Sequence, residues 1–214
     1  MIVLALDTAL ETCSAAVTDG DRVLAARSEP MARGHQERLA PLVAEVMAEA
    51  GIGFGALDRI GVTVGPGSFT GLRVGLAFAK GLGVALDRPV VGIGTLEALA
   101  AGTAGFAAAV IDARRGQVYV QGLRDGRPAA EPQALAVEDA ADMLIYIDAA
   151  GPTRLVGLGA ALLAQAFPGA TVDPRPGADP VRLAALAAAA EPGLLKPIYL
   201  RAPDAKLPAS ALGA

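Results

Sequence analysis

The chain has 214 residues, of which 53% are hydrophobic, 4% aromatic and 19% charged. This composition excludes intrinsic disorder, which requires low hydrophobicity and high net charge. The formal net charge is −4 at pH 7, whereas proteins that bind nucleic acid directly usually carry a basic stripe. The densest basic cluster, Arg114-Arg115 with Arg124 and Arg127, is typical of a solvated hairpin. We therefore expect a globular protein that does not bind nucleic acid by itself.

The mean hydropathy of +0.47 raises the question of a membrane segment. The longest uncharged stretch, residues 155–172, contains glycines and a proline, and its unbroken apolar part ends near Phe167. That part is shorter than the ~20 residues that a spanning helix needs. The N-terminus reaches Asp7 too early for a signal peptide, and the single cysteine, Cys13, has no internal disulfide partner. These features predict a cytoplasmic protein without a membrane segment.

The first half of the chain predicts a mixed β-sheet covered by helices. Short, largely apolar runs and the Asp19-Gly20 turn favour strands at residues 2–6, 13–18, 22–26, 60–64 and 90–93. Helices are predicted from near residue 37 to Gly51, with Pro41 in the first turn, and at residues 70–86 and 95–101. Three antiparallel strands followed by alternating helices and strands are typical of such a sheet.

The second half predicts a smaller and less regular lobe. Strands are expected at residues 107–113 and 117–123, and helices near residues 137–144, 160–167 and 179–189. Asp179 is placed as the cap of the last helix, with Pro180 at its first position. The Gly102–Gly105 segment is the predicted hinge, so the lobes would comprise residues 1–103 and 104–214, the latter with a mobile tail after Arg201.

The helix predicted at residues 70–86 has little polar surface. Its only charged residues, Arg73 and Lys80, lie seven apart on one narrow face, and a helix that is apolar nearly all round must be covered on more than one side. Small residues recur at four-residue spacing, namely Gly71, Gly75, Ala79 and Gly83. This ridge fits either close packing on the chain's own sheet or first helix, or contact with a partner's helix. In both cases the excess apolar surface favours an oligomer or a complex.

The glycine-rich loop at residues 65–71 joins a predicted strand to a predicted helix. Free N–H groups at a helix start can bind an anion, and Ser68 or Thr70 could cap the helix. However, Leu72-Arg73 replaces the Lys-Ser/Thr pair of a Walker A loop, which favours a structural turn over a phosphate cradle.

Asp7, Thr8 and Asp112 are the candidates for a vestigial nucleotide site. Asp7 and Thr8 follow the first strand, and Asp112 ends the first strand of the second half. Ala9-Leu10 stands where close backbone approach to a phosphate would favour glycine, which argues against nucleotide binding by this chain alone.

The sequence offers no convincing catalytic set. His35 is the only histidine and has no second His or Cys near it in sequence, whereas a metal site needs three or four ligands at suitable spacing. Cys13 is expected to be a buried core thiol. We therefore expect no catalytic residue, no metal and no cofactor.

Several segments together resemble a known family. They are residues 4–9, 13–16, 34–35, 39–41, 65–76, 79–81, 111–114, 118–119 and 197–201. This combination resembles the TsaB (YeaZ) family, a bacterial subunit of the tRNA threonylcarbamoyladenosine machinery. The likeness is specific across the first 100 residues or so, and beyond them it depends on the last three of these segments, with residues 128–195 unmatched.

The resemblance implies an actin-like ATPase (ASKHA) fold, an α/β architecture of two ribonuclease-H-like lobes with mixed β-sheets flanked by helices. It also implies a non-catalytic subunit that binds and activates a TsaD-type transferase, which modifies the tRNA adenosine next to the anticodon. A TsaE-like ATPase subunit would join the assembly, tRNA would be met only through the complex, and the chain alone would form a homodimer.

The resemblance further implies pairing through the two N-terminal helices. The predicted partner interface comprises His35, Leu39, Leu42, Val43, Val46, Gly71, Leu72, Gly75, Leu76, Ala79 and Gly83. One alternative is a degenerate actin-like ATPase or kinase that holds Mg-ATP with Asp7, Thr8 and Asp112. The other is a glycoprotease-like metallopeptidase, which loses support because Leu39 replaces the second histidine of the TsaD metal motif.

Overall fold

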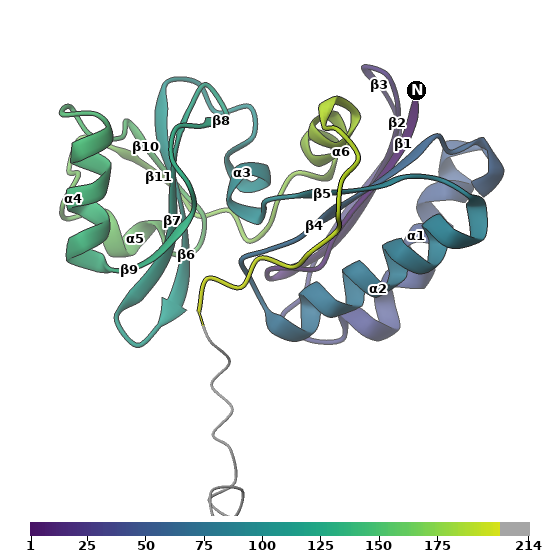
Figure 1. Cartoon of the computed structure of the whole chain (residues 1–214), viewed down its shortest axis with the longest axis horizontal. Helices are drawn as coiled ribbons and strands as arrows, with labels where there is room; N and C mark the ends of the chain where they lie inside the picture. The colour runs from purple at the N-terminus through teal and green to yellow at the C-terminus, as the bar shows by residue number, and fades with distance from the viewer. Residues whose placement is uncertain (202–214) are drawn as a thin grey trace, which may run out of the picture.

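The computed structural model describes residues 1–201, which form two β-sheets with helices on both faces of each (Figure 1). The first sheet has the strand order β3-β2-β1-β4-β5. Its strands are β1 (Ile2–Asp7), β2 (Thr12–Asp19), β3 (Arg22–Pro30), β4 (Arg59–Thr63) and β5 (Val90–Ile93). β1 to β3 are antiparallel, and β4 and β5 run parallel to β1. The mixed sheet predicted for the first half is therefore confirmed.

The second sheet has the order β11-β10-β6-β7-β8, with β9 also paired to β7. Its strands are β6 (Phe106–Arg114), β7 (Gln117–Arg124), β8 (Arg127–Pro128), β9 (Gln133–Ala136), β10 (Arg154–Val156) and β11 (Thr171–Asp173). β6 pairs antiparallel with β7 and parallel with β10. Strands β6 and β7 were predicted, whereas β8 to β11 have only two to four residues each and give no alternation that a sequence pattern could reveal.

Four helices cover the two outer faces of the molecule (Figure 1). α1 (His35–Ala50) and α2 (Phe69–Leu86) lie on the first sheet, and α4 (Val137–Ile147) and α5 (Ala160–Leu163) lie on the second. Gly51 ends α1 in the left-handed region, at φ 68°, as predicted. Because α1 begins at His35, Pro41 lies in the second turn and not in the first, which corrects the predicted start.

Two helices lie between the sheets, and each packs on the sheet that the other half of the chain forms (Figure 1). α3 (Thr95–Ala100) packs on β6 and β7, with Leu96 and Leu99 buried in that cluster. α6 (Pro180–Ala189) packs on the first sheet, where Leu183 and Ala187 are buried. A division into residues 1–103 and 104–214 therefore separates the sheets but does not describe the packing of α3 and α6. The predicted tail after Arg201 lies outside the described residues.

Candidate partner interface

The residues predicted for the partner interface lie inside the chain. All eleven are buried, and Leu39, Leu42 and Val46 share one apolar cluster with the side chains of the first sheet. The His35 side chain also makes a contact within the chain, because its Nε2 lies 3.1 Å from the Thr12 carbonyl oxygen. The structure thus corrects the choice of side chains, since these hold α1 and α2 to the sheet. Pairing of the two helices with a partner stays a prediction and would have to use their opposite faces.

The glycine ridge of α2 fits the close-packing alternative. A Cβ at Gly71 would collide with the Thr8 carbonyl oxygen, and one at Gly75 would lie 2.7 Å from Thr8 Oγ1. Thr8 Oγ1 donates a hydrogen bond to the Gly71 carbonyl oxygen at 2.8 Å. A Cβ at Gly83 would likewise collide with the Val90 side chain. The ridge therefore lets α2 approach the turn after β1 and the start of β5.

The glycine-rich loop is held by the chain itself. The Ser68 N–H donates to the Ala9 carbonyl oxygen at 2.8 Å, and Ser68 Oγ accepts from the Gly71 N–H at 3.2 Å. A Cβ at Gly67 would collide with the Ala9 carbonyl oxygen. Of the two predicted caps, Ser68 and Thr70, the structure thus selects Ser68, and the loop is a structural turn packed against residues 7–9.

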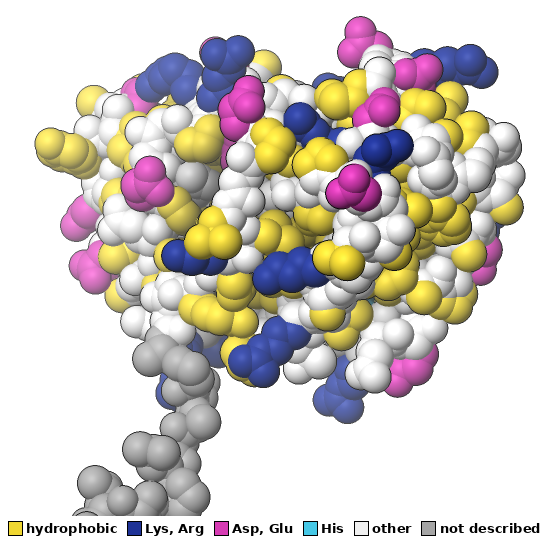
Figure 2. All heavy atoms as spheres, turned by 45° about the vertical axis from the view of Figure 1, so that its right-hand side comes forward, with side chains coloured by type: hydrophobic (Ala, Val, Ile, Leu, Met, Phe, Trp, Pro, Cys, Tyr) yellow, Lys and Arg dark blue, Asp and Glu magenta, His cyan; other side chains and the backbone are white. Residues whose placement is uncertain are grey.

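An open groove separates the outer faces of α1 and α2. Its volume is about 560 Å³, and it is lined by Gln36, Leu39, Ala40, Phe69, Thr70, Arg73, Val74, Ala77 and Phe78. We call this surface the outer groove. Figure 2 turns this side of the molecule forward and shows hydrophobic side chains spread over it. Of the predicted interface residues, only Leu39 lines the groove.

None of the groove residues on α2 was included in the predicted interface, although a signal for them exists. Phe69, Arg73 and Ala77 recur at the same four-residue spacing as the glycine ridge but two residues out of phase with it. They therefore lie on the face opposite the ridge. Once the small residues are assigned to the sheet, this second stripe becomes the exposed one, with Phe69 44% accessible.

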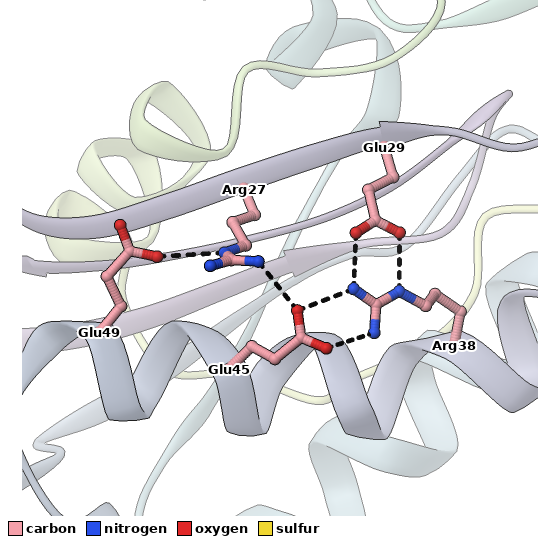
Figure 3. Close-up of polar contacts among 5 residues, drawn as sticks. All are labelled: Arg27, Glu29, Arg38, Glu45 and Glu49. Carbon is pink, nitrogen blue, oxygen red and sulfur yellow. Dashed lines mark hydrogen bonds and ion pairs between the residues drawn. The ribbon is translucent and has the colours of Figure 1, made fainter.

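An ion-pair network joins α1 to the edge strand β3 (Figure 3). Arg38 donates to both oxygens of Glu29 at 2.7 and 2.6 Å, and to both oxygens of Glu45 at 2.7 and 2.8 Å. Arg27 donates to Glu45 at 3.0 Å and to Glu49 at 3.1 Å. These hydrogen bonds from Arg38 hold the pKa values of Glu29 and Glu45 below their ordinary value of 4.5. The network therefore holds α1, which forms one wall of the outer groove, against β3.

The nucleotide candidates do not surround one cavity. Asp7 is fully buried and accepts hydrogen bonds from Thr63 Oγ1 at 2.5 Å and from the Ala9 N–H at 2.8 Å, and burial raises its pKa. Thr8 is buried as well. Asp112 instead lines a separate cavity of about 250 Å³, together with Leu10, Glu11, Ile111, Arg114 and Leu158.

Three further properties bear on whether the chain holds a metal, has a reactive thiol or contains a membrane-spanning helix. Within residues 1–201, no three His, Cys, Asp or Glu side chains gather as metal ligands would. Cys13 is buried, and burial raises the pKa of its thiol to about 11. In the same part of the chain, α2 is long and apolar enough to cross a membrane, but core helices of soluble proteins share this property, and one of its faces packs on the first sheet.

Comparison with known proteins gives a consistent result. Residues 27–167 match the family model described as tRNA N6-adenosine threonylcarbamoyltransferase. An uncharacterized protein of Mycobacterium tuberculosis is 40% identical over 206 residues, which cover 95% of this chain and 93% of that protein. The tRNA threonylcarbamoyladenosine biosynthesis protein TsaB of Escherichia coli is 37% identical over 124 residues, which cover 56% of this chain and 53% of TsaB.

Solved structures agree over nearly the whole chain. A Pseudomonas aeruginosa protein described as similar to peptidase YeaZ superposes with a TM-score of 0.78 at 33% identity, covering 94% of this chain and 99% of that one. YeaZ from Pseudomonas aeruginosa superposes with a TM-score of 0.72 at 30% identity, covering 93% and 99%. The expected architecture of two mixed sheets flanked by helices is confirmed, and it is shared with these YeaZ structures.

Proposed function

Because the chain belongs to the TsaB (YeaZ) family and so has a role in tRNA threonylcarbamoyladenosine biosynthesis, we propose that it is the subunit that binds and activates the TsaD-type transferase. In this proposal the chain is non-catalytic, and the transferase modifies the tRNA adenosine next to the anticodon. A TsaE-like ATPase subunit joins the assembly, the chain pairs with itself when the transferase is absent, and the complex works in the cytoplasm.

The outer groove is the observation that carries this proposal. It presents Phe69, Val74, Ala77 and Phe78 to solvent on a helix whose other face is already covered by the sheet. An exposed apolar surface rimmed by polar residues is typical of a protein–protein interface. Covering it with a partner's helices would remove the apolar surface of α2 that the chain's own sheet leaves exposed.

The family relationship favours the transferase as the partner. The model that matches residues 27–167 describes the transferase itself, so the transferase is expected to contain counterparts of α1 and α2. Related chains can pair through equivalent surfaces about a pseudo-two-fold axis, as identical chains do about a true one. The same geometry accounts for a homodimer of this chain in the absence of the transferase.

Co-purification with a tagged TsaD-type transferase tests the proposal. Ala77→Glu places a charge in the groove at an exposed position and is expected to reduce co-purification at least tenfold, roughly the effect of 1.4 kcal/mol. Ala161→Glu, on the exposed side of α5, is the matched control and should co-purify normally. Far-UV circular dichroism of both variants checks that the fold is kept. Normal co-purification of Ala77→Glu would rule out the outer groove as the interface.

The Mg-ATP alternative has less support. Asp7 and Thr8 are buried and hydrogen-bonded within the chain, and the cavity beside Asp112 is lined by neither of them. Calorimetric titration of the chain with Mg-ATP separates the two functions. Heat of binding that disappears in Asp112→Asn would favour the ATPase or kinase alternative.

A further inference from the structure

Residues 190–201 form a strap that crosses the first lobe beside α2 and ends at the second lobe (Figure 1). Leu195 lines a cavity with Lys80 and Val84 in the C-terminal half of α2. Further along the strap, the Ile198 N–H donates to the Val64 carbonyl oxygen at 2.7 Å. Arg201 then donates to the Ala113 carbonyl oxygen, at the end of β6, at 2.7 Å. The strap thus brings one side of α2 and the β6–β7 turn onto one face, which we call the strap face.

The strap face collects basic side chains that are far apart in the sequence. α2 supplies Arg73 and Lys80, the strap supplies Lys196 and Arg201, and the β6–β7 turn supplies Arg114 and Arg115. Five of these six residues are exposed, and within residues 1–201 three acidic residues, Glu11, Asp87 and Asp112, share a cavity or an ion pair with them. Figure 2 shows Lys and Arg side chains over the lower centre of this side, with few acidic side chains among them. The strap face is therefore locally basic on a chain whose net charge is −4.

Two aromatic rings stand among these charges. Phe69 and Tyr199 are each 44% exposed, and their ring centroids are 5.5 Å apart. The Arg73 guanidinium carbon lies 3.7 Å from the Phe69 ring centroid. Exposed aromatic rings within a basic surface are the usual platform on which proteins stack unpaired bases.

The β6–β7 turn holds its arginines in an unfavourable backbone conformation. Arg114, Arg115 and Gly116 have φ values of 65°, 56° and 73°. Glycine, asparagine and aspartate are favoured in this left-handed region. The turn is supported by Asp112 Oδ1, which accepts from the Arg114 N–H at 2.7 Å. Strain retained at an exposed turn points to a role for the side chains themselves.

From these observations we infer that the strap face binds RNA, with its basic side chains along the phosphates and the exposed Tyr199 ring, which lies outside the outer groove, against an unpaired base. The inference rests on the proposed function in one respect, that the RNA is the tRNA substrate. Phe69 and Arg73 also line the outer groove, so RNA held by a transferase at the groove would continue onto the strap face. The chain would then contact tRNA directly, in addition to any contact made through its partner.

Fluorescence anisotropy with a labelled tRNA anticodon stem-loop, measured over a range of KCl concentrations, tests this inference on the full chain. The strap variant Arg114→Asn, Arg115→Asn, Lys196→Gln removes three charges and places asparagine where the backbone favours it. It is expected to weaken binding about tenfold and to lower the slope of log affinity against log salt by about two, at roughly 0.7 for each phosphate contact. The control Arg22→Gln, Arg33→Gln, Arg127→Gln removes three exposed charges elsewhere and should bind as the wild type does.

A second variant tests the Tyr199 ring. Tyr199→Ala should weaken binding of the stem-loop, while Tyr199→Phe should restore it and neither should alter binding of an RNA duplex without a loop. Equal losses in the strap variant and the control, or no salt-dependent binding by the wild type with or without the transferase, would overturn the inference. Co-purification with the transferase is measured in parallel. A wild-type chain that binds RNA but does not co-purify would remove the proposed partner and leave the RNA surface standing.

Discussion

Gly71 and Gly81 lie on the same helix but in opposite surroundings. A Cβ at Gly71 would collide with the Thr8 carbonyl oxygen, whereas a Cβ at Gly81 would meet nothing within 4 Å. We expect Gly71→Ala to lower the free energy of unfolding by about 1–3 kcal/mol, because the turn after β1 would have to move. Gly81→Ala should raise it by about 1 kcal/mol, since alanine favours a helix interior. Urea unfolding followed by circular dichroism measures both.

The two substitutions control for each other, because both add one methyl group to α2. Equal effects of the two would mean that the contact between Gly71 and Thr8 does not limit the packing of α2. A loss confined to Gly71→Ala would instead explain why a glycine stands at this position. Its function would then be to let the helix start pack against the turn, with no phosphate involved.

At the scale of residues, the sequence predicted local features well but not the distant residues that contact them. A cap at Ser68 or Thr70 follows from residue type and position next to an apolar run, and in the structure Ser68 is the cap. The partner of Gly71 is Thr8, 63 residues away, and no local pattern encodes that distance. The glycine-rich loop and the Asp7-Thr8-Ala9 turn look like two separate motifs in the sequence, but they are two sides of one contact.

At the scale of elements, Arg38 sets how α1 sits on β3. Carboxylates with a lowered pKa in the folded state stabilise the fold above their ordinary value of 4.5, and this contribution is lost as the pH falls through the folded-state pKa. Arg38→Met should therefore destabilise the chain at pH 7, and the difference from the wild type should shrink as the pH falls below 4.5. Urea unfolding at pH 7, 5 and 3.5 checks this.

Arg33→Met is the control for this prediction, because Arg33 is exposed just before α1. It should show no such dependence on pH. High salt should also reduce the effect of Arg38→Met, since all members of the network are partly exposed and their charges are screened. A difference between Arg38→Met and wild type that is constant from pH 7 to 3.5 would contradict an electrostatic role for the network.

The helices show which part of the fold a hydrophobic pattern can specify. The near absence of charge on α2 correctly indicated a helix that is apolar on more than one side. The same pattern could not say which face meets the chain's own sheet, so it left the ridge open between packing within the chain and contact with a partner. It also could not say that α3 and α6 each pack on the sheet of the other half of the chain. An apolar stripe identifies the buried face of a helix but not the sheet that covers it.

At the scale of the whole molecule, the crossing of α3 and α6 makes the lobes depend on each other. α6 covers Val3, Ala5 and Ile93 on the inner face of the first sheet. Arg59 of β4 also donates to the carbonyl oxygens of residues 187, 188 and 190 at 2.8, 3.1 and 2.6 Å. A fragment that ends at the predicted hinge would lose this cover and leave the Arg59 guanidinium without these acceptors.

We therefore expect residues 1–103 alone to lack a cooperative unfolding transition, while the full chain unfolds in a single one. The comparison is made by thermal and urea unfolding followed by circular dichroism. All three tyrosines lie beyond residue 103, so tyrosine fluorescence is added for the full chain only, where its curve should coincide with that from circular dichroism. In the full chain, Leu183→Ala should cost about 2–5 kcal/mol, because it opens a cavity under the first sheet although Leu183 belongs to the second half of the sequence. A fragment of residues 1–103 that unfolds cooperatively near the transition of the full chain would show that the first sheet does not need α6. The two lobes would then be independent folding units, and α6 would only dock on a sheet that is already stable.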